Sequence, residues 1–308
     1  MSNSDANKLH YNGDPLIFFM LYTQLILGSL LTLGFYSFWG CTNIRRYTIG
    51  SISIRQERYQ YHGTGTELFA GFIKTLTFII LYILLNLGVL WSGIRLLEWN
   101  SDWFIQTVLV INIFSINSLI FYGLHQSLKY RISRTSWRSI RYHLSGSSWE
   151  FTKLCLTKTL LNMVSLGLLI PRSTLEIYST IINNLYFGDQ KYRFHYQNHH
   201  LLKPHLITLV LFIPTLGLSR IWYWAQLHNF MISHLEFMDL KFKSTATAGN
   251  LLQLYLTNIL LILGTLGLGI PFAIHRSIKF HMEHLNIVGD LDRKRILQAT
   301  KEKFALHP

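Results

Sequence analysis

The stretch that decides the fold is a tripeptide that occurs four times. It reads Thr32-Leu33-Gly34, Ser165-Leu166-Gly167, Thr215-Leu216-Gly217 and Thr265-Leu266-Gly267. The last three copies are spaced by 50 residues, and the first gap is 133 residues. Positions downstream agree without gaps, such as Ile52, Leu185, Leu235 and Leu285, each 18 residues after the glycine. The chain therefore contains an internal repeat, and we predict its architecture one repeat unit at a time.

Each unit predicts the same order of elements. An apolar helix ends near the glycine, an aromatic or proline-containing turn follows, and an amphipathic helix then leads into a segment with period-two alternation. Alternating aromatic and β-branched residues favour strands, here at about 52–61, 185–194, 235–243 and, as a shorter copy, 285–288. We predict one integral-membrane domain, 1–308, with units at about 10–67, 143–200, 194–250 and 244–290 and an inserted helical hairpin at 68–150.

Six apolar stretches surround these turns. They are about 15–39, 67–92, 102–124, 150–170, 205–226 and 250–274. Each is roughly 20 residues or longer, which is the length that crosses a hydrocarbon core as a helix. The alternative is a set of buried helices in a soluble protein. We predict a mainly α, polytopic helical membrane protein with about six apolar helices, a repeat of about 50 residues and short β-strand segments in cytoplasmic loops.

The composition supports a membrane protein. Half of the residues are apolar and 14% are charged, against about 25% charged in an average soluble domain. The net charge of +13 would suit a nucleic acid or an anionic membrane surface. No nucleic-acid motif is present, so we expect the lipid bilayer, including anionic lipids, as the partner and no nucleic acid. The sequence leaves the oligomeric state open.

Basic residues in the connections predict the topology. In the first half, the connections 40–66 and 125–150 are rich in Lys and Arg, whereas 1–14 and 92–102 hold one each. This alternation follows the positive-inside rule. The second half shows no alternation, because all its connections are basic. We therefore expect 67–92 and 102–124 to span fully, the repeat helices to form tight or re-entrant hairpins, and the strand segments to share the cytoplasmic side.

Several motifs resemble a known family. They are Thr32-Leu33-Gly34-Phe35-Tyr36-Ser37-Phe38-Trp39, Arg45-Arg46-Tyr47, the run 59–71, Thr135-Ser136-Trp137-Arg138-Ser139-Ile140-Arg141-Tyr142 and the segment 276–289. Together they resemble the YjgN family of bacterial inner-membrane proteins, which carry a domain of unknown function. The chain departs from that pattern at Ser139, where the family usually has Gly, and at Phe38. The resemblance implies a multi-pass protein of the bacterial inner (cytoplasmic) membrane and supplies no activity.

Two groups of residues are candidate binding sites. Arg134, Arg138 and Arg141 lie in a basic, aromatic run that could hold anionic lipid head groups, although topology alone would explain the same charges. Lys153, Lys158 and Asn162 lie in an apolar stretch, where ionisable residues often mark function. Snorkelling of the two lysines to the headgroup zone is the alternative.

Other chemistry is not indicated. Histidines cluster around 195–205 and 275–284 but lack Cys or acidic partners, so we expect no metal and no cofactor. Gly63-Thr64-Gly65 lacks the rest of a phosphate-binding loop and predicts a turn. Cys41 and Cys155 are expected to be small buried hydrophobes. No nucleophile with a base and no paired carboxylates are apparent, and we predict that the protein is not an enzyme.

Two hypotheses about function remain. The first is a small-solute transporter or channel-like component, because transporters are often built from repeats. The second is a non-catalytic membrane protein that binds anionic lipid or organises membrane partners, because the basic aromatic face has no other evident use.

Overall fold

A computed structural model describes residues 8–95, 102–196 and 201–289. Within these ranges it contains ten helices and ten strands. The helices are α1 Pro15–Leu31, α2 Ser37–Gly50, α3 Gly65–Arg95, α4 Asp102–Ser133, α5 Ser148–Val164, α6 Ile170–Ile182, α7 Leu202–Val210, α8 Ser219–Ser233, α9 Ala248–Gly264 and α10 Ile270–Glu283. The strands are β1 Leu9–Tyr11, β2 Ile52–Ile54, β3 Glu57–Tyr61, β4 Thr135–Trp137, β5 Ile140–Leu144, β6 Leu185–Phe187, β7 Gln190–Phe194, β8 Leu235–Phe237, β9 Leu240–Ser244 and β10 Leu285–Val288.

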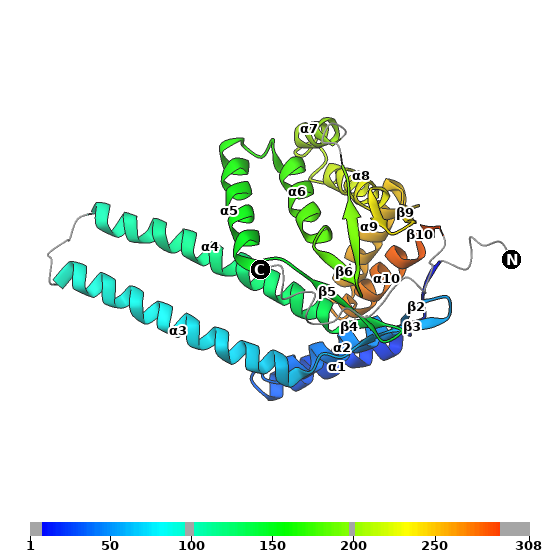
Figure 1. Cartoon of the computed structure of the whole chain (residues 1–308), viewed down its shortest axis with the longest axis horizontal. Coiled ribbons are helices and arrows are strands. Elements are labelled where there is room, and N and C mark those ends of the chain that lie inside the picture. The colour runs from blue at the N-terminus through cyan, green and yellow to red at the C-terminus, as the bar shows by residue number, and fades with distance from the viewer. Residues whose placement is uncertain (1–7, 96–101, 197–200, 290–308) are drawn as a thin grey trace.

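The strands form one antiparallel sheet in chain order. Each strand from β2 to β9 pairs with the strand before it and the strand after it, and β1 also contacts β10. The sheet therefore curves into a nearly closed ring, which we call the strand ring. A helical hairpin precedes each new pair of strands, and the long hairpin α3–α4 projects away from the rest of the molecule (Figure 1).

Tight turns close the β-hairpins of the strand ring. In the first, Arg55 and Gln56 have φ values of 49° and 67°, and in the second Arg138 and Ser139 have 53° and 65°. Positive φ at both central residues is the mark of a type I′ turn, whose twist matches that of the flanking strands. These turns fix the register in which one face of every strand points into the ring.

Alternation along the strands separates an aromatic interior from a cationic exterior. Equivalent positions of the second strand in four units hold Tyr59, Tyr142, Tyr192 and Phe242 inside, next to exposed Arg58, Arg141, Lys191 and Lys241 outside. Trp137, Phe187 and Phe237 from the first strands complete the interior and are buried. The ring is thus filled by side chains and does not enclose an open pore.

The repeated tripeptide forms the turn between two helices. The leucine has a φ of 49° to 51° in all four copies, and the glycine has a φ of 84° to 93°. The hydroxyl of Thr32 donates to the carbonyl of Gly28 at 2.7 Å and accepts the amide of Tyr36 at 2.8 Å. Thr265 makes the same pair of bonds. This left-handed turn satisfies the backbone at the helix end and reverses the chain.

The expected fold class is wrong. Only α3 and α4, with 31 and 32 residues, are long and apolar enough to cross a membrane among the described residues. The other four apolar stretches break at the tripeptide turn, so their first helices have at most 17 residues, or about 25 Å. The protein is an α-helical and β-sheet repeat with a ten-stranded ring, and not a bundle of six membrane helices.

The strand segments agree with the alternation in the sequence, but their extent was underestimated. The segments expected at 52–61, 185–194, 235–243 and 285–288 are β2–β3, β6–β7, β8–β9 and β10. Strands β1, β4 and β5 were not expected. Because all the strands share one sheet, they lie on one side of the helical hairpins. The segment 68–150 contains α3, α4, β4 and β5, which is the same order of elements as in the other units.

Candidate functional site: a cationic chamber beneath the strand ring

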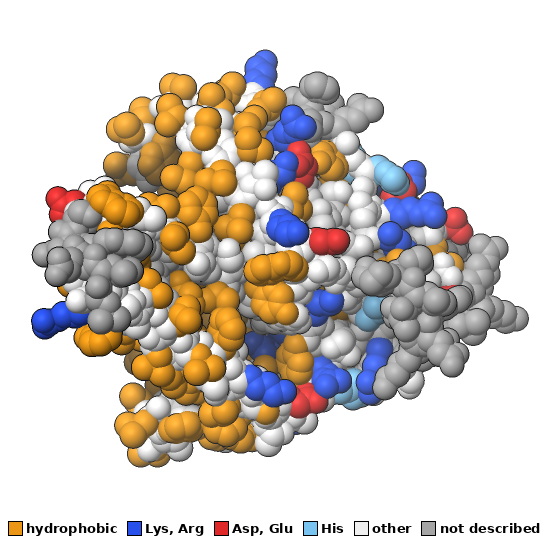
Figure 2. Space-filling model, turned by 60° about the vertical axis from the view of Figure 1, so that its left-hand side comes forward, with side chains coloured by type: hydrophobic (Ala, Val, Ile, Leu, Met, Phe, Trp, Pro, Cys, Tyr) orange, Lys and Arg blue, Asp and Glu red, His pale blue; other side chains and the backbone are white. Residues whose placement is uncertain are grey.

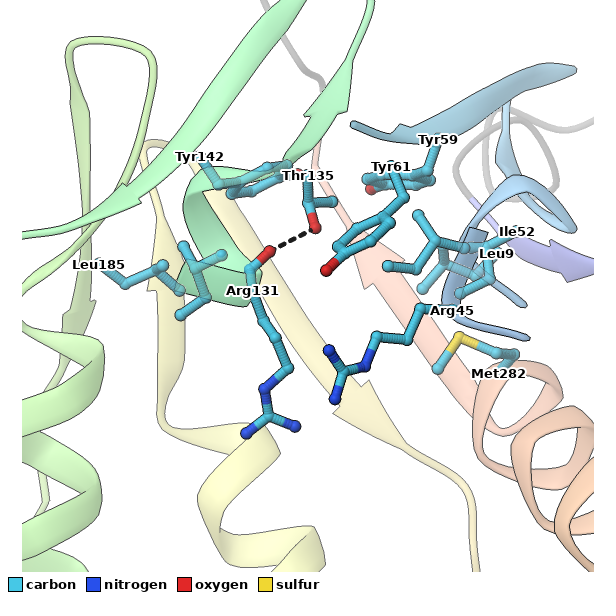
Figure 3. Close-up of a pocket in the computed structure, with 12 residues that line it drawn as sticks. Leu9, Arg45, Ile52, Tyr59, Tyr61, Arg131, Thr135, Tyr142, Leu185 and Met282 are labelled. Atoms are coloured by element: carbon cyan, nitrogen blue, oxygen red, sulfur yellow. Dashed lines mark hydrogen bonds between the residues drawn. The ribbon is translucent and has the colours of Figure 1, made fainter. Parts of the chain in front are cut away.

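A chamber of about 520 Å³ lies between the strand ring and the ends of helices α2, α4 and α10. Its walls combine apolar side chains with two arginines and several tyrosines (Figure 3). The lining residues are Leu9, Arg45, Ile49, Ile52, Tyr59, Tyr61, Arg131, Ile132, Thr135, Tyr142, Leu185 and Met282. No acidic side chain of the described chain is among them, so the chamber is positively charged.

The two arginines come from different repeat units and point into the same space. Arg45 lies on α2 and Arg131 near the end of α4, and both guanidinium groups extend away from the sheet (Figure 3). Arg131 donates from Nε to the carbonyl of Ser127, one turn earlier, at 3.3 Å. Within the described ranges the Arg45 side chain has no hydrogen-bond or ion-pair partner. Two guanidinium groups without carboxylates favour an anionic ligand.

Tyrosines form the roof of the chamber. The ring centroids of Tyr59 and Tyr142 are 6.4 Å apart. Burial raises the pKa of Tyr59 and of Tyr192 and holds the pKa of Tyr142 well above its usual range. All three are therefore neutral phenols at physiological pH and cannot act as bases. Tyr59 and Tyr142 line the chamber, whereas Tyr192 lies in the interior of the ring.

Tyr61 is the exception within this roof. Its side chain is only 5% exposed. Its hydroxyl has no hydrogen-bond partner among the described residues, and it points toward the Arg45 guanidinium (Figure 3). A buried hydroxyl without a partner loses its hydration without compensation, so this atom is free to bind a ligand in the chamber.

The arginines singled out from the sequence lie around the strand ring, outside the chamber. The Arg134 guanidinium is bound to the carboxylate of Glu67, with Nη2–Oε1 at 2.6 Å. Arg138 pairs with Glu57 of the neighbouring strand β3 and lies over Trp137 at 5.0 Å. Arg141 is on the exterior of β5 and is exposed. Arg134 and Arg138 are thus paired with carboxylates of the protein, and Arg141 lies on the outer face of the ring.

The polar residues of the fourth apolar stretch hold two helices together. Lys158 forms an ion pair with Glu176 of α6, and Asn162 accepts from Ser173 of α6 at 2.8 Å. Lys153 is exposed. Lys158 takes the repeat position of Thr208 and Asn258. The Asn258 amide donates to Ser277 of the second helix, and the backbone carbonyl of Thr208 accepts from Ser219. The structure therefore gives Lys158 and Asn162 interhelical contacts within one hairpin.

Two of the candidate histidines link repeat units, whereas His281 and His284 bond to carbonyls of their own helix. His205 bonds to the carbonyl of Gly167, and His275 to the carbonyl of Gly13, each at 3.0 Å. His199 and His200 lie outside the described residues. No group of three or more His, Cys, Asp or Glu side chains in the described ranges is placed to hold a metal ion.

Sequence reasoning missed Arg45 and Tyr61 and did not single out Arg131 as a site residue. The available signal was departure from the repeat. Positions that recur between units serve the shared fold, whereas Arg45 and Arg131 have apolar, hydroxyl, phenol or imidazole counterparts in the other units. Tyr61 recurs as Tyr11, so this signal does not distinguish it.

The strand ring and its helical hairpins define an internally repeated protein with two helices able to cross a membrane. The chain belongs to the family described as "Bacterial protein of unknown function (DUF898)", whose model matches residues 6–219 and 199–306. This is the YjgN family, so the resemblance based on the sequence motifs is confirmed. No curated protein and no solved structure matches the chain.

Proposed function

We propose that the protein is a non-catalytic, multi-pass protein of the bacterial inner membrane that binds anionic lipid. In this proposal α3 and α4 cross the bilayer, the four short hairpins enter it from the cytoplasmic side, and the strand ring lies in the cytoplasm. The proposal rests chiefly on one observation, which is the exposure of the leucines at the four hairpin tips.

The leucines at the hairpin tips would be unfavourable if the tips lay in water. Leu33, Leu166, Leu216 and Leu266 are 87% to 95% exposed and adopt the left-handed conformation. That conformation costs an L-residue roughly 1–2 kcal/mol, and in an aqueous turn Gly or Asn is the usual choice. Insertion of each leucine into hydrocarbon would return roughly 1.5–3 kcal/mol, which explains why all four units retain it.

The surface has the polarity that this orientation requires. Apolar side chains cover the end that carries the hairpins, and Lys and Arg gather toward the other end (Figure 2). The exterior of the strand ring carries exposed Arg58, Arg141, Lys191, Arg193, Lys241 and Lys243. Cations next to a bilayer surface attract anionic head groups by roughly 1 kcal/mol each. These residues suit the cytoplasmic headgroup layer and favour anionic lipid.

A small-solute transporter is the second candidate. The chamber beneath the strand ring favours it, since an anionic solute would fit between Arg45 and Arg131. The filled interior of the ring argues against a straight path along its axis. A channel would therefore need the ring to open, whereas lipid binding requires no such rearrangement. Binding of inorganic phosphate to the chamber, compared with binding of a phospholipid, tests this candidate.

Cysteine accessibility tests the proposed orientation. Single cysteines in place of Gln60, Arg193 and Lys243, all exposed on the strand ring, should react with a membrane-impermeant maleimide only from the cytoplasmic side. A cysteine in place of Asp102 should react only from the other side. A cysteine in place of Leu166 should resist the impermeant reagent from both sides but react in detergent.

Two outcomes would reject the proposal. Labelling of the Leu166 position from the aqueous phase would show that the hairpin tips do not enter the bilayer. Labelling of the Gln60 and Arg193 positions from opposite sides would contradict the shared sheet in the membrane-bound protein.

A further inference from the structure

The chamber is the place where the repeat symmetry breaks. The position of Arg45, eleven residues after the turn glycine, holds Tyr178, His228 and Ile278 in other units. The position of Arg131 holds Thr48, Ile181, Met231 and His281. The position of Tyr61 holds Leu144, Phe194 and Ser244 in later strands, but Tyr11 in β1, whose hydroxyl is also buried without a partner among the described residues. Departures from a local rule without a structural gain are expected at functional sites. Here two of them, Arg45 and Arg131, converge on one cavity.

None of these three polar side chains is paired with a carboxylate or with a polar side chain of another element among the described residues. The Tyr61 hydroxyl is buried without a partner, and the Arg45 guanidinium has no acceptor, both within the described chain. The one bond of Arg131 is to its own helix. The neighbouring Arg134 and Arg138 differ in this respect, because each forms an ion pair with a glutamate carboxylate. The chamber thus combines two arginines that no carboxylate of the described residues neutralises with a buried phenol.

We propose that Arg45, Arg131 and Tyr61 bind a phosphate group in this chamber. Guanidinium groups match phosphate oxygens with paired, charge-assisted hydrogen bonds, and a neutral phenol adds a third donor. Arg45 lies on α2, which precedes the long hairpin, and Arg131 lies on α4, one of the two helices of that hairpin. The phosphate is therefore held next to the helices that cross the membrane.

The rest of the lining indicates the source of the phosphate. Leu9, Ile49, Ile52, Leu185 and Met282 make most of the remaining wall apolar. A phospholipid presents such a surface with its glycerol and the first carbons of its acyl chains, whereas free phosphate does not. This assignment to lipid rests on the proposed membrane location, while the phosphate chemistry stands without it.

Binding to the full-length, detergent-purified protein tests the site. The probes are dioctanoyl-phosphatidylglycerol, dioctanoylglycerol and inorganic phosphate, each titrated by calorimetry. The double variant Arg45→Gln/Arg131→Gln should weaken binding of the phospholipid by at least about tenfold, since both charge-assisted contacts are lost. Tyr61→Phe keeps the shape and should weaken it by roughly threefold. Lys203→Gln, at an exposed lysine of α7 that does not line the chamber, is the control and should leave the affinity unchanged.

The outcomes separate the possible sources and the two proposals. Inorganic phosphate that binds as tightly as the lipid, and depends on both arginines, would assign the site to a soluble anion and favour the transporter. Equal binding of dioctanoylglycerol, or an unchanged affinity in the double variant with normal Tyr61→Phe binding, would overturn the site. Failure of the cysteine-labelling pattern with retained phosphate binding would reject the membrane orientation alone.

Discussion

The long hairpin and the four short hairpins are made from the same repeat unit, yet they are suited to different depths in a bilayer. Helices α3 and α4 have 31 and 32 residues, or about 47 Å, which exceeds a hydrocarbon core of about 30 Å. Helix α9 has 17 residues and ends in the left-handed turn at Leu266 and Gly267. The position of one turn decides whether the same architecture can cross a membrane or only enter it.

The contacts of the two kinds of hairpin differ accordingly. Helices α5 and α6 are joined by the Lys158–Glu176 and Asn162–Ser173 contacts. Helices α3 and α4 are joined by a bond from Tyr82 to Asn112 at 2.8 Å and, at the end next to the strand ring, by a bond from Tyr130 to Glu67 at 2.9 Å. Most of their apolar side chains are exposed. Along most of its length the long hairpin therefore depends on its surroundings, whereas the α5–α6 hairpin has polar contacts between its own helices.

The turn glycine provides the largest test of this comparison. Gly267 has a φ of 92°, and a Cβ there would only touch Ile270 at 3.9 Å. Gly267→Ala should destabilise the protein by about 1–2 kcal/mol, through backbone strain alone. Gly264→Ala, in the helix of the same hairpin with no atom near its Cβ, should stabilise by roughly 0.5–1 kcal/mol. Thermal unfolding in detergent measures both.

Gly88→Ala extends that test to the long hairpin. Gly88 lies within α3, and a Cβ there would meet no atom. Its replacement should behave like that of Gly264. If Gly267→Ala left the unfolding temperature unchanged, the left-handed turn would not be what limits the short helices.

Local features of the sequence were sufficient for part of this fold. The recurrence of Thr-Leu-Gly and the alternation at 52–61 predicted the turns, the family and most strands. The pattern around Thr135 and Tyr142 has the same alternation, but its basic residues suggested a lipid-binding loop, so β4 and β5 were missed. The lengths of the apolar stretches suggested six membrane spans, because hydropathy does not reveal a left-handed turn within an apolar stretch.

The candidate site was less predictable for a physical reason. Arg45, Arg131 and Tyr61 are separated by up to 86 residues in sequence and meet only because the strand ring closes above them. Arginines such as Arg134 look the same in sequence but are neutralised by Glu67. Pairing between distant carboxylates and cations decides which charges stay available, and a single sequence does not contain that information.

The ion pair of α5 and α6 gives a smaller test. The Lys158 side chain is 16% exposed, and that of Glu176 is 22% exposed. Lys158→Met should destabilise the protein by about 1–2 kcal/mol, because a partly buried carboxylate loses one of its two cations. Arg172 remains bound to Glu176 at 2.8 Å and limits the loss.

Lys153→Met is the matched control for Lys158→Met. Lys153 lies on the same helix and is exposed, so its replacement should change stability by less than about 0.5 kcal/mol. If both variants behave alike when unfolding is followed in the same detergent, the polar contacts do not hold the short hairpin together.

The smallest expected effect concerns His143, in the strands that follow the long hairpin. Its ring stacks on Tyr186 with centroids 4.7 Å apart, while Gln60, Arg193 and Lys243 occupy the same position in other units. Burial, with a smaller contribution from Lys129, lowers the pKa of His143 to about 4, against about 6.5 in an unfolded chain. Between these values the unfolded chain binds a proton that the folded protein does not.

Stability should therefore fall as the pH decreases from about 6.5 toward 4. We expect a loss of roughly 1 kcal/mol between pH 7 and pH 5 from this residue. His143→Gln introduces the side chain that the first unit has at Gln60 and should make the decline shallower by that amount. The measurement is the unfolding free energy in detergent at several pH values. If the variant shows the same pH dependence, the pKa of His143 is not lowered in the folded protein. In that case the strands after the long hairpin do not differ from the other strands in this respect.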